Sequence, residues 1–388
     1  MLDAPAIVRA ASPLLERRVP FLVATVVRVQ GSSYRRPGAR LLATAEGRVA
    51  GNVSGGCLES DLIRTGLWRT RNGPVVLRYD SRDPEEGDAV LGCGGIVDVL
   101  LEQGNGRDRD HPLALLAGAL ASGQRARMAT VFRSTDPDIP LGARWCVRDE
   151  ELAPPAAKGA RATRSDLVER IFSGQWRPSA RSASPGYTAS SERPASSEPP
   201  RATSRSIETG RGAIEVLIEP IVPPPHLFVL GAGLDAFPLV RMAQQIGWSV
   251  TVWSASPSFA SRARFEAAGA TLLGDLDLVR ARIDAADRAL AIVMGHNVGR
   301  DRAALAMALG SRASYIGILG PRHRTVSLAG DFPAKLEDPR VHAPVGLDLG
   351  AETPDEVAMS IVAEMLAHLR GASREPLRRR SAIHRASG

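Results

Sequence analysis

A short glycine-rich segment at residues 51–62, GNVSGGCLESDL, contains the residue types in this chain that are best suited to chemistry. Cys57 offers a thiol that can act as a nucleophile or as a soft metal ligand, and Glu59 follows it in an acidic segment typical of a helix start. The amides of Gly55 and Gly56, which precede that helix, are suited to hold an anion beside the thiol. The other interpretation is a small buried cysteine beside glycines that only a tight turn requires.

A second turn of the same kind, LGCGG at residues 91–95, places Cys93 before Gly94 and Gly95. If the two turns meet in the folded chain, they form a thiol-bearing pocket lined by bare backbone. Such a pocket suits a flat, anionic molecule that contains sulfur or metal. Cys146 stands in the run ARWCVRD without a glycine pair, and we interpret it as structural.

Two arginines precede the first turn in the segment GSSYRRPG, residues 31–38. Arg35 and Arg36 are either donors for a phosphate near Cys57 or part of an ordinary solvated turn. No set of residues predicts a metal site, although Cys57 remains a candidate soft ligand.

Hydrophobic periodicity and turn residues predict the elements that position these turns. Both Cys-Gly turns are expected at strand ends, where loops carry function on a rigid sheet. The expected elements of this half are helices at 4–17, 58–72, 111–122 and 165–172, and strands at 21–30, 39–44, 47–53, 74–80, 96–102, 125–133 and 213–219.

Composition excludes several classes of protein. The chain has 388 residues, 44% of them hydrophobic, and no apolar run near the roughly 20 residues that span a bilayer. Its net charge of +7 comes from basic residues in 153–211 and after 370, which is typical of solvated segments rather than of a nucleic-acid groove. Three cysteines and no secretory signal predict a cytoplasmic protein without a disulfide framework.

The sequence predicts an α/β chain with a disordered linker between two domains. Residues 176–212 are rich in Ser, Pro and Arg and hold almost no aliphatic residues, so they cannot bury enough apolar surface to order. The expected parts are an N-terminal α+β domain at 1–175 with a small mixed sheet and a returning strand at 213–219, the linker, a Rossmann-like doubly wound parallel sheet at 220–370, and a basic flexible tail at 371–388.

The Rossmann-like prediction depends on HLFVLGAG at residues 226–233, a strand followed by a Gly-Ala-Gly turn and a helix. Gly231 and Gly233 open a turn whose helix N-terminus faces a phosphate. The carboxylate that usually ends the second strand and binds a ribose is replaced by Ser254, which suits a further phosphate better than NAD. Strands at 288–294 and 315–319 extend the βα pattern.

His296, in MGHNVGRD, follows a buried strand at the edge where open sheets bind ligands. It is either a ligand-binding residue or a hydrogen-bonded loop residue. A long helix is expected to start near Thr353, and Asp348 and Glu352 before it either cap the turn or help to close the pocket.

Six motifs in this order resemble the XdhC/CoxI family, the xanthine dehydrogenase accessory factors. The motifs are GSSYRRPGARLLAT, GNVSGGCLESDL, LGCGGIVDVLLE, PPPHLFVLGAG, YIGILGPRHR and HAPVGLDLGAETPDEVAMSIVAEML. The resemblance implies a homodimeric chaperone that binds molybdenum cofactor (molybdopterin), protects it during sulfuration and delivers it to a xanthine dehydrogenase or carbon monoxide dehydrogenase-type hydroxylase. It also implies a Rossmann domain of unsettled ligand.

The chain departs from the family at Ser254, where an acid is common, and at Gly295, His296 and Asn297, where a Thr-His-Asp-like run is common. The leading hypothesis is therefore a cofactor chaperone rather than an enzyme, with a molybdenum hydroxylase apoenzyme and a cysteine desulfurase as partners and an NADP-like nucleotide in the second domain. The alternatives are an NAD(P)-dependent oxidoreductase and an enzyme that modifies the cofactor by sulfur or nucleotidyl transfer.

Overall fold

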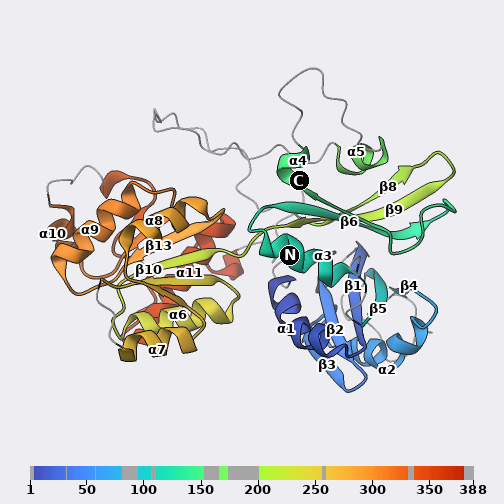
Figure 1. The fold of residues 1–388 in the computed structure, drawn as a ribbon, viewed down its shortest axis with the longest axis horizontal. Coiled ribbons are helices and arrows are strands. Elements are labelled where there is room, and N and C mark those ends of the chain that lie inside the picture. Colours follow the sequence, from blue (N-terminus) through green and yellow to red (C-terminus); the bar gives the residue numbers. More distant parts are fainter. Residues whose placement is uncertain are drawn as a thin grey trace. The chain divides into compact units, whose positions relative to one another are not determined.

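The computed structural model describes residues 4–31, 33–56, 58–80, 95–105, 108, 111–152, 166–173, 201–255, 259–330 and 336–379. These residues form two compact units (Figure 1). The first unit ends at Pro223 and the second begins at Pro224.

The first sheet of the N-terminal unit has five antiparallel strands in the order β3-β2-β1-β5-β4. Its central strand β1 is buried over its first seven residues, FLVATVV, which explains the continuous apolar run. The elements of this layer are α1 (Ala4–Arg17), β1 (Phe21–Gln30), β2 (Arg40–Thr44), β3 (Gly47–Gly51), α2 (Glu59–Arg69), β4 (Val75–Asp80) and β5 (Ile96–Gly104).

A second antiparallel sheet completes this unit, with the order β7-β6-β9-β8. The returning strand is confirmed as β9, but the expectation of one mixed sheet is wrong, because every described pairing in the unit is antiparallel. The elements are α3 (Pro112–Ala121), β6 (Ala126–Ser134), β7 (Arg144–Arg148), α4 (Asp149–Leu152), α5 (Asp166–Phe172), β8 (Thr203–Glu208) and β9 (Ala213–Ile221).

The expected linker extends too far towards the C-terminus. Thr203–Glu208 pairs with β9 along its whole length, and Ser204 Oγ donates to Val27 O at 2.5 Å. The strand is polar because it lies at the sheet edge and buries only the side chain of Ile207. Residues 174–200 lie outside the described part of the chain.

Two ion pairs, one fully buried and one partly buried, join the two sheets of the first unit. Arg40 on β2 donates to Glu219 on β9 at 2.6 Å, and their side chains are 2% and 0% exposed. Arg28 on β1 contacts Glu215 on β9 at 2.6 Å. Removing one member of such a pair leaves an uncompensated buried charge, so these contacts define how the sheets pack.

The C-terminal unit is a six-stranded parallel sheet in the order β12-β11-β10-β13-β14-β15, and the doubly wound prediction is confirmed. The strand order reverses between β10 and β13, which is the position where such sheets bind ligands. The elements are β10 (His226–Leu230), α6 (Ala236–Gln245), β11 (Ser249–Trp253), α7 (Phe259–Ala267), β12 (Thr271–Leu273), α8 (Leu276–Ala285), β13 (Ala289–Val293), α9 (Val298–Leu309), β14 (Tyr315–Ile318), α10 (Arg322–Ala329), β15 (Val341–His342), α11 (Pro354–Arg370) and a 3-10 turn (Leu377–Arg379).

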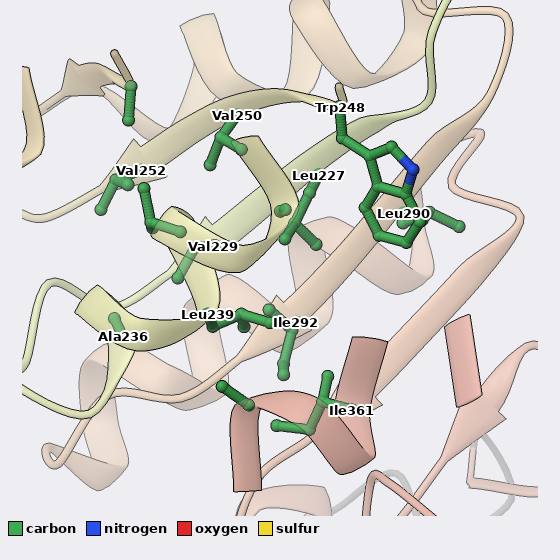
Figure 2. Close-up of a cluster of buried hydrophobic side chains, with 14 of the residues drawn as sticks. Leu227, Val229, Ala236, Leu239, Trp248, Val250, Val252, Leu290, Ile292 and Ile361 are labelled. Carbon is green, nitrogen blue, oxygen red and sulfur yellow. The ribbon is translucent and has the colours of Figure 1, made fainter. Parts of the chain in front are cut away.

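Helices cover both faces of this parallel sheet. On one face, alternate strand residues such as Leu227, Val229 and Ile292 pack against Leu239 of α6 and Ile361 of α11 (Figure 2). The residues between them on the strands face the core shared with α8, α9 and α10. Burial on both faces accounts for the uniformly apolar strands.

The last helix is fixed at both its start and its middle. Thr353 caps α11 in a capping box with Glu356, as the expected helix start near residue 353 required. The buried carboxylate of Glu364 accepts from Tyr315 Oη at 2.6 Å and from the Gly346 amide at 2.8 Å, and contacts His342 Nδ1 at 3.2 Å. Among the described residues, no helix combines the length and apolar character needed to cross a membrane.

Candidate functional site

Three of the sequence motifs leave the first sheet at the same end. β1 runs towards the 31–39 loop, β3 runs towards the Gly55–Gly56 turn, and β5 begins immediately after Gly95. The register pairs that establish this are Thr25–Arg40, Leu41–Gly51 and Gln30–Ile96. Strands β3 and β5 are three places apart in the sheet, about 14 Å across it, and β5 begins level with Gln30 whereas β3 ends level with Ala24.

The turn after β3 folds around the carboxylate of Glu59. Its Oε1 accepts from the amides of Val53 at 2.9 Å and Ser54 at 2.8 Å, and its Oε2 accepts from the Ser54 hydroxyl. Ser54 Oγ in turn accepts from the amides of Gly56 and Leu58, each at 3.1 Å. Burial favours a raised pKa for Glu59, but the hydrogen bonds from Ser54 and Val53 lower the pKa on balance, so the carboxylate is ionised.

Glu59 therefore stabilises the turn through these hydrogen bonds. Its side chain is buried, with the residue 7% exposed. A contact between Glu59 and a cofactor remains a prediction. Arg35 lies within electrostatic reach of Glu59. Burial lowers the pKa of Arg35, and the charge of Glu59 opposes that change. Arg36 is half-buried in the same loop, where its carbonyl accepts from the Ala39 amide at 3.1 Å.

The outer surface of this turn is bare backbone. Gly55 and Gly56 are exposed, and a Cβ built on either would meet none of the described residues beyond its chain neighbours within 4 Å. Gly56 has a φ of +122°, which side chains rarely adopt. The turn thus leaves space beside its backbone, where the Gly56 amide already donates to Ser54 Oγ. Cys57, Cys93 and Gly94 lie outside the described residues, while Gly95 is buried at the start of β5.

In the second unit, the glycine turn after β10 approaches the end of β13 at the reversal of strand order. Gly231 has a φ of +139°, and a Cβ there would lie 2.6 Å from the Gly295 amide nitrogen. Only glycine permits this approach. The Gly-Ala-Gly turn follows β10 as expected, and the structure adds a close contact between it and the loop after β13.

His296 lies over the same turn. Its Nε2 would be 3.0 Å from a Cβ on Gly233 and is 3.6 Å from Asp235 Oδ2, at the N-terminus of α6. The structure therefore brings Gly231, Gly233 and His296 together, as the sequence predicted for the carboxyl edge of the sheet. Whether they bind a nucleotide remains a prediction.

A buried ion pair supports the loop that carries His296. Arg324 of α10 donates to Asp301 Oδ2 at 2.5 Å and to the Gly295 carbonyl at 2.7 Å. Burial raises the pKa of Asp301, and the contact with Arg324 counteracts this. A Cβ on Gly295 would lie 2.1 Å from Asp301 Oδ1, so glycine is required beside this pair.

Sequence reasoning missed Ser54, Asp235, Asp301 and Arg324 as parts of these sites. Asp235 was detectable, since it stands two residues after Gly233 at the helix start.

Ser254 follows β11 as expected, and its amide donates to Leu273 O at 3.0 Å. Within the described ranges, no group of three or more His, Cys, Asp or Glu residues is arranged to hold a metal ion.

The fold defines the class: a two-unit protein in which a Rossmann-type parallel sheet follows an antiparallel unit with a glycine-rich turn. The model of the XdhC and CoxI family matches residues 14–80, and the model of the XdhC Rossmann domain matches residues 227–365. The chain belongs to the XdhC and CoxI family.

Two relatives match this chain over nearly its whole length, and a third matches part of it. A Bacillus subtilis protein, named as a probable xanthine dehydrogenase subunit, is 26% identical over 91% of this chain and 94% of its own length. A crystal structure of a xanthine dehydrogenase from Bacillus halodurans superposes with a TM-score of 0.65 at 26% identity, covering 94% of this chain and 98% of that one. The uncharacterized protein YqeB of Escherichia coli is 29% identical over 40% of this chain and 29% of its own length.

Proposed function

We propose that this protein is an accessory factor that binds molybdenum cofactor, protects it while its sulfur is installed, and delivers it to a xanthine dehydrogenase or carbon monoxide dehydrogenase-type hydroxylase. Membership of the XdhC and CoxI family supports an accessory role of this kind. The name of the Bacillus subtilis relative, which refers to xanthine dehydrogenase, supports a molybdenum enzyme as the partner.

The observation that carries this proposal is that three of the motifs adjoin strand ends on the same side of the first sheet. Gly55 and Gly56 present open backbone there, and Arg35 lies close to the turn through its electrostatic contact with Glu59. Amides and a guanidinium suit the phosphate of molybdopterin. The residues that are described thus fit the anionic end of this cargo.

The thiols of Cys57 and Cys93 would supply soft groups beside the dithiolene and metal of the bound cofactor. The hydrogen bonds of Glu59 and Ser54 keep the turn in one conformation, so little ordering is needed when a ligand binds. In this proposal the hydroxylase apoenzyme receives the cofactor, a cysteine desulfurase supplies the sulfur, and the protein acts as a homodimer.

The test is to purify the full-length protein from a host that makes molybdopterin and to measure bound pterin by fluorescence after oxidation. Retention of pterin, and its transfer to an apo-hydroxylase with a gain of activity, is the expected result. A well-folded protein that carries no pterin and activates no apoenzyme would refute the proposal.

A second function, nucleotide binding by the C-terminal unit, is favoured by one specific observation. Gly231 approaches Gly295 at the reversal of strand order, and His296 lies over Gly233. We propose an NADP-like or pterin nucleotide as the ligand, because Ser254 offers no carboxylate to a ribose. Calorimetric titration of the protein with NAD, NADP and cytidine or guanosine nucleotides tests this. Binding of NAD with turnover of an aldehyde or a hydroxy acid would instead support an oxidoreductase.

A further inference from the structure

Helix α2 presents an aromatic side chain that the fold of its own unit does not use. The helix packs on one face of the first sheet, where Leu62 and Leu67 contact a buried cluster formed with β1 and β2. Trp68 is turned away from that cluster and is 64% exposed. The other tryptophans that the structure describes are buried or half-buried, namely Trp145, Trp248 and Trp253. A ring so exposed buries little area on folding and therefore adds little to stability.

Two exposed arginines adjoin Trp68 at the end of the helix. The guanidinium carbon of Arg71 lies over the ring, 4.8 Å from its centroid, and Arg69 donates to the Thr65 hydroxyl at 3.0 Å. Among the described residues, neither arginine forms an ion pair. Cations at a helix C-terminus complement the helix dipole, which accounts for the two charges but not for the exposed tryptophan.

A third arginine, Arg64, stands one turn before Trp68 on the same side of the helix. It pairs with Asp61 at 3.1 Å, and its side chain is 76% exposed, so the pair is held weakly. The other acid of α2, Glu59, is buried. The exposed side of the helix thus carries three guanidinium groups against one carboxylate. We name this region the α2 surface, and it consists of Arg64, Trp68, Arg69 and Arg71.

The composition of the α2 surface indicates the chemistry of a partner. Tryptophan and arginine are the residues that most often dominate the binding energy of protein interfaces. Guanidinium groups pair with carboxylates in a bidentate manner, so an acidic protein surface complements the three arginines. Single-stranded nucleic acid would need successive rings on which its bases stack, and Trp68 is the one aromatic residue in α2.

The α2 surface also lies near the glycine-rich turn. The exposed Gly55 and Gly56 come shortly before the helix, which begins at Glu59. Trp68 follows that start by about 14 Å along the helix axis. A standard protein interface covers about 800 Å² on each partner and is roughly 30 Å across. One partner is therefore large enough to cover Trp68 and the open backbone of the turn together.

We propose that the α2 surface is the docking site for an acidic surface of the molybdenum hydroxylase that receives the cofactor. Trp68 is the apolar anchor, and Arg69 and Arg71 pair with carboxylates of that enzyme. The choice of the hydroxylase as the partner rests on the proposed function, whereas the acidic chemistry follows from the residues of α2.

The test measures binding of the full-length protein to xanthine dehydrogenase apoenzyme from a host that makes no molybdopterin, by biolayer interferometry at low and high salt. Trp68→Ala and Arg71→Glu should each weaken binding at least tenfold. Both variants should keep the wild-type melting temperature and pterin content, because neither side chain belongs to the core or to the turn. The exposed Arg9→Glu on α1, which packs on the other face of the sheet, is the matched control and should bind as the wild type does.

The readouts separate this inference from the proposed function. A protein that carries no pterin but binds the apoenzyme through Trp68 would refute cofactor binding and retain the docking site. Absence of binding by the wild type, or unchanged binding by Trp68→Ala and Arg71→Glu, would overturn the docking site whatever the pterin content. Sedimentation velocity and titration with DNA complete the test. Dissociation of a dimer by Trp68→Ala, or binding of DNA that Arg71→Glu abolishes, would assign the α2 surface to a different partner and also overturn the proposal.

Discussion

Glu59 binds Ser54 twice, through the backbone amide at 2.8 Å and through the side-chain hydroxyl. Because Ser54 Oγ also accepts from the amides of Gly56 and Leu58, one carboxylate organises the whole turn that precedes α2. The acid that was predicted from the sequence to bind a cofactor is thus the residue that shapes the backbone of this turn.

Replacing Glu59 with Gln should destabilise the first unit by about 1–3 kcal/mol, since an amide cannot accept as strongly from three buried donors. The folded-state pKa of Glu59 is below the ordinary 4.5, so its stabilisation is present above that pH and is lost as pH falls further. Urea unfolding at pH 7 measures the change. The exposed Glu46→Gln is the control, and equal stability of both variants would contradict this account.

Cys57→Ala should lower molybdopterin co-purification at least several-fold with the circular dichroism spectrum unchanged. A thiolate before a helix N-terminus is stabilised by the helix dipole, which also favours the bound anion. Cys93→Ala should have the smaller effect, and Cys146→Ala should retain the wild-type pterin content. Unchanged pterin in a folded Cys57→Ala variant would make this cysteine structural.

Deletion of residues 181–199 should leave the melting temperature within a few degrees of the wild type, because loop length contributes only about 0.6 kcal/mol per doubling. Extending the deletion to residue 204 should lower it clearly, since Thr203 and Ser204 belong to β8 and Ser204 contacts β1. Differential scanning calorimetry compares the two. A large loss from the shorter deletion would show that 181–199 packs on the fold.

Ser254→Asp should shift nucleotide preference towards NAD, because a carboxylate after β11 would bind the ribose hydroxyls and repel a 2′-phosphate. The wild type should prefer NADP or a pterin nucleotide. Titration calorimetry gives the order of affinities, with Ser249→Asp at the opposite end of β11 as the control. Equal preference in the wild type and Ser254→Asp would place the nucleotide, if one binds, elsewhere.

Glu364→Gln should lower the stability of the second unit at neutral pH and remove part of the dependence of that stability on pH in acid. Burial favours a raised pKa, but hydrogen bonds from His342, Tyr315 and the Gly346 amide outweigh it and lower the pKa of Glu364 to about 2. The stabilisation, on the order of 3 kcal/mol, is therefore present above pH 4.5 and lost between pH 4.5 and 2. Unfolding followed across that window should lose this dependence in Glu364→Gln and keep it in the exposed Glu337→Gln.

The local elements of this fold could be predicted because their signals are local. Apolar periodicity located β1 and α1, and Gly231 with Gly233 located the turn after β10. Strand β8 escaped detection because an edge strand buries few side chains, so its residues have the composition of a linker. Composition alone does not distinguish an edge strand from a disordered linker.

The contacts that organise the sites join residues far apart in sequence. Arg40 and Glu219 are separated by 179 positions, and Asp301 meets Arg324 across two helices. Neither the hydrophobic periodicity nor the spacing of residues in the sequence indicates which distant residues form such a pair. The sequence therefore located the loops of the candidate sites, while the groups that hold those loops in place required the fold.

The position of β9 has a consequence for how the chain folds during synthesis. This strand lies inside the second sheet, between β6 and β8, although it is the last strand of its unit to be made. Until residue 221 leaves the ribosome, β6 presents an open edge and the carboxylates of Glu215 and Glu219 are missing from Arg28 and Arg40. We therefore expect the nascent N-terminal unit to need protection until β9 arrives, and a chain ended at residue 175 to aggregate.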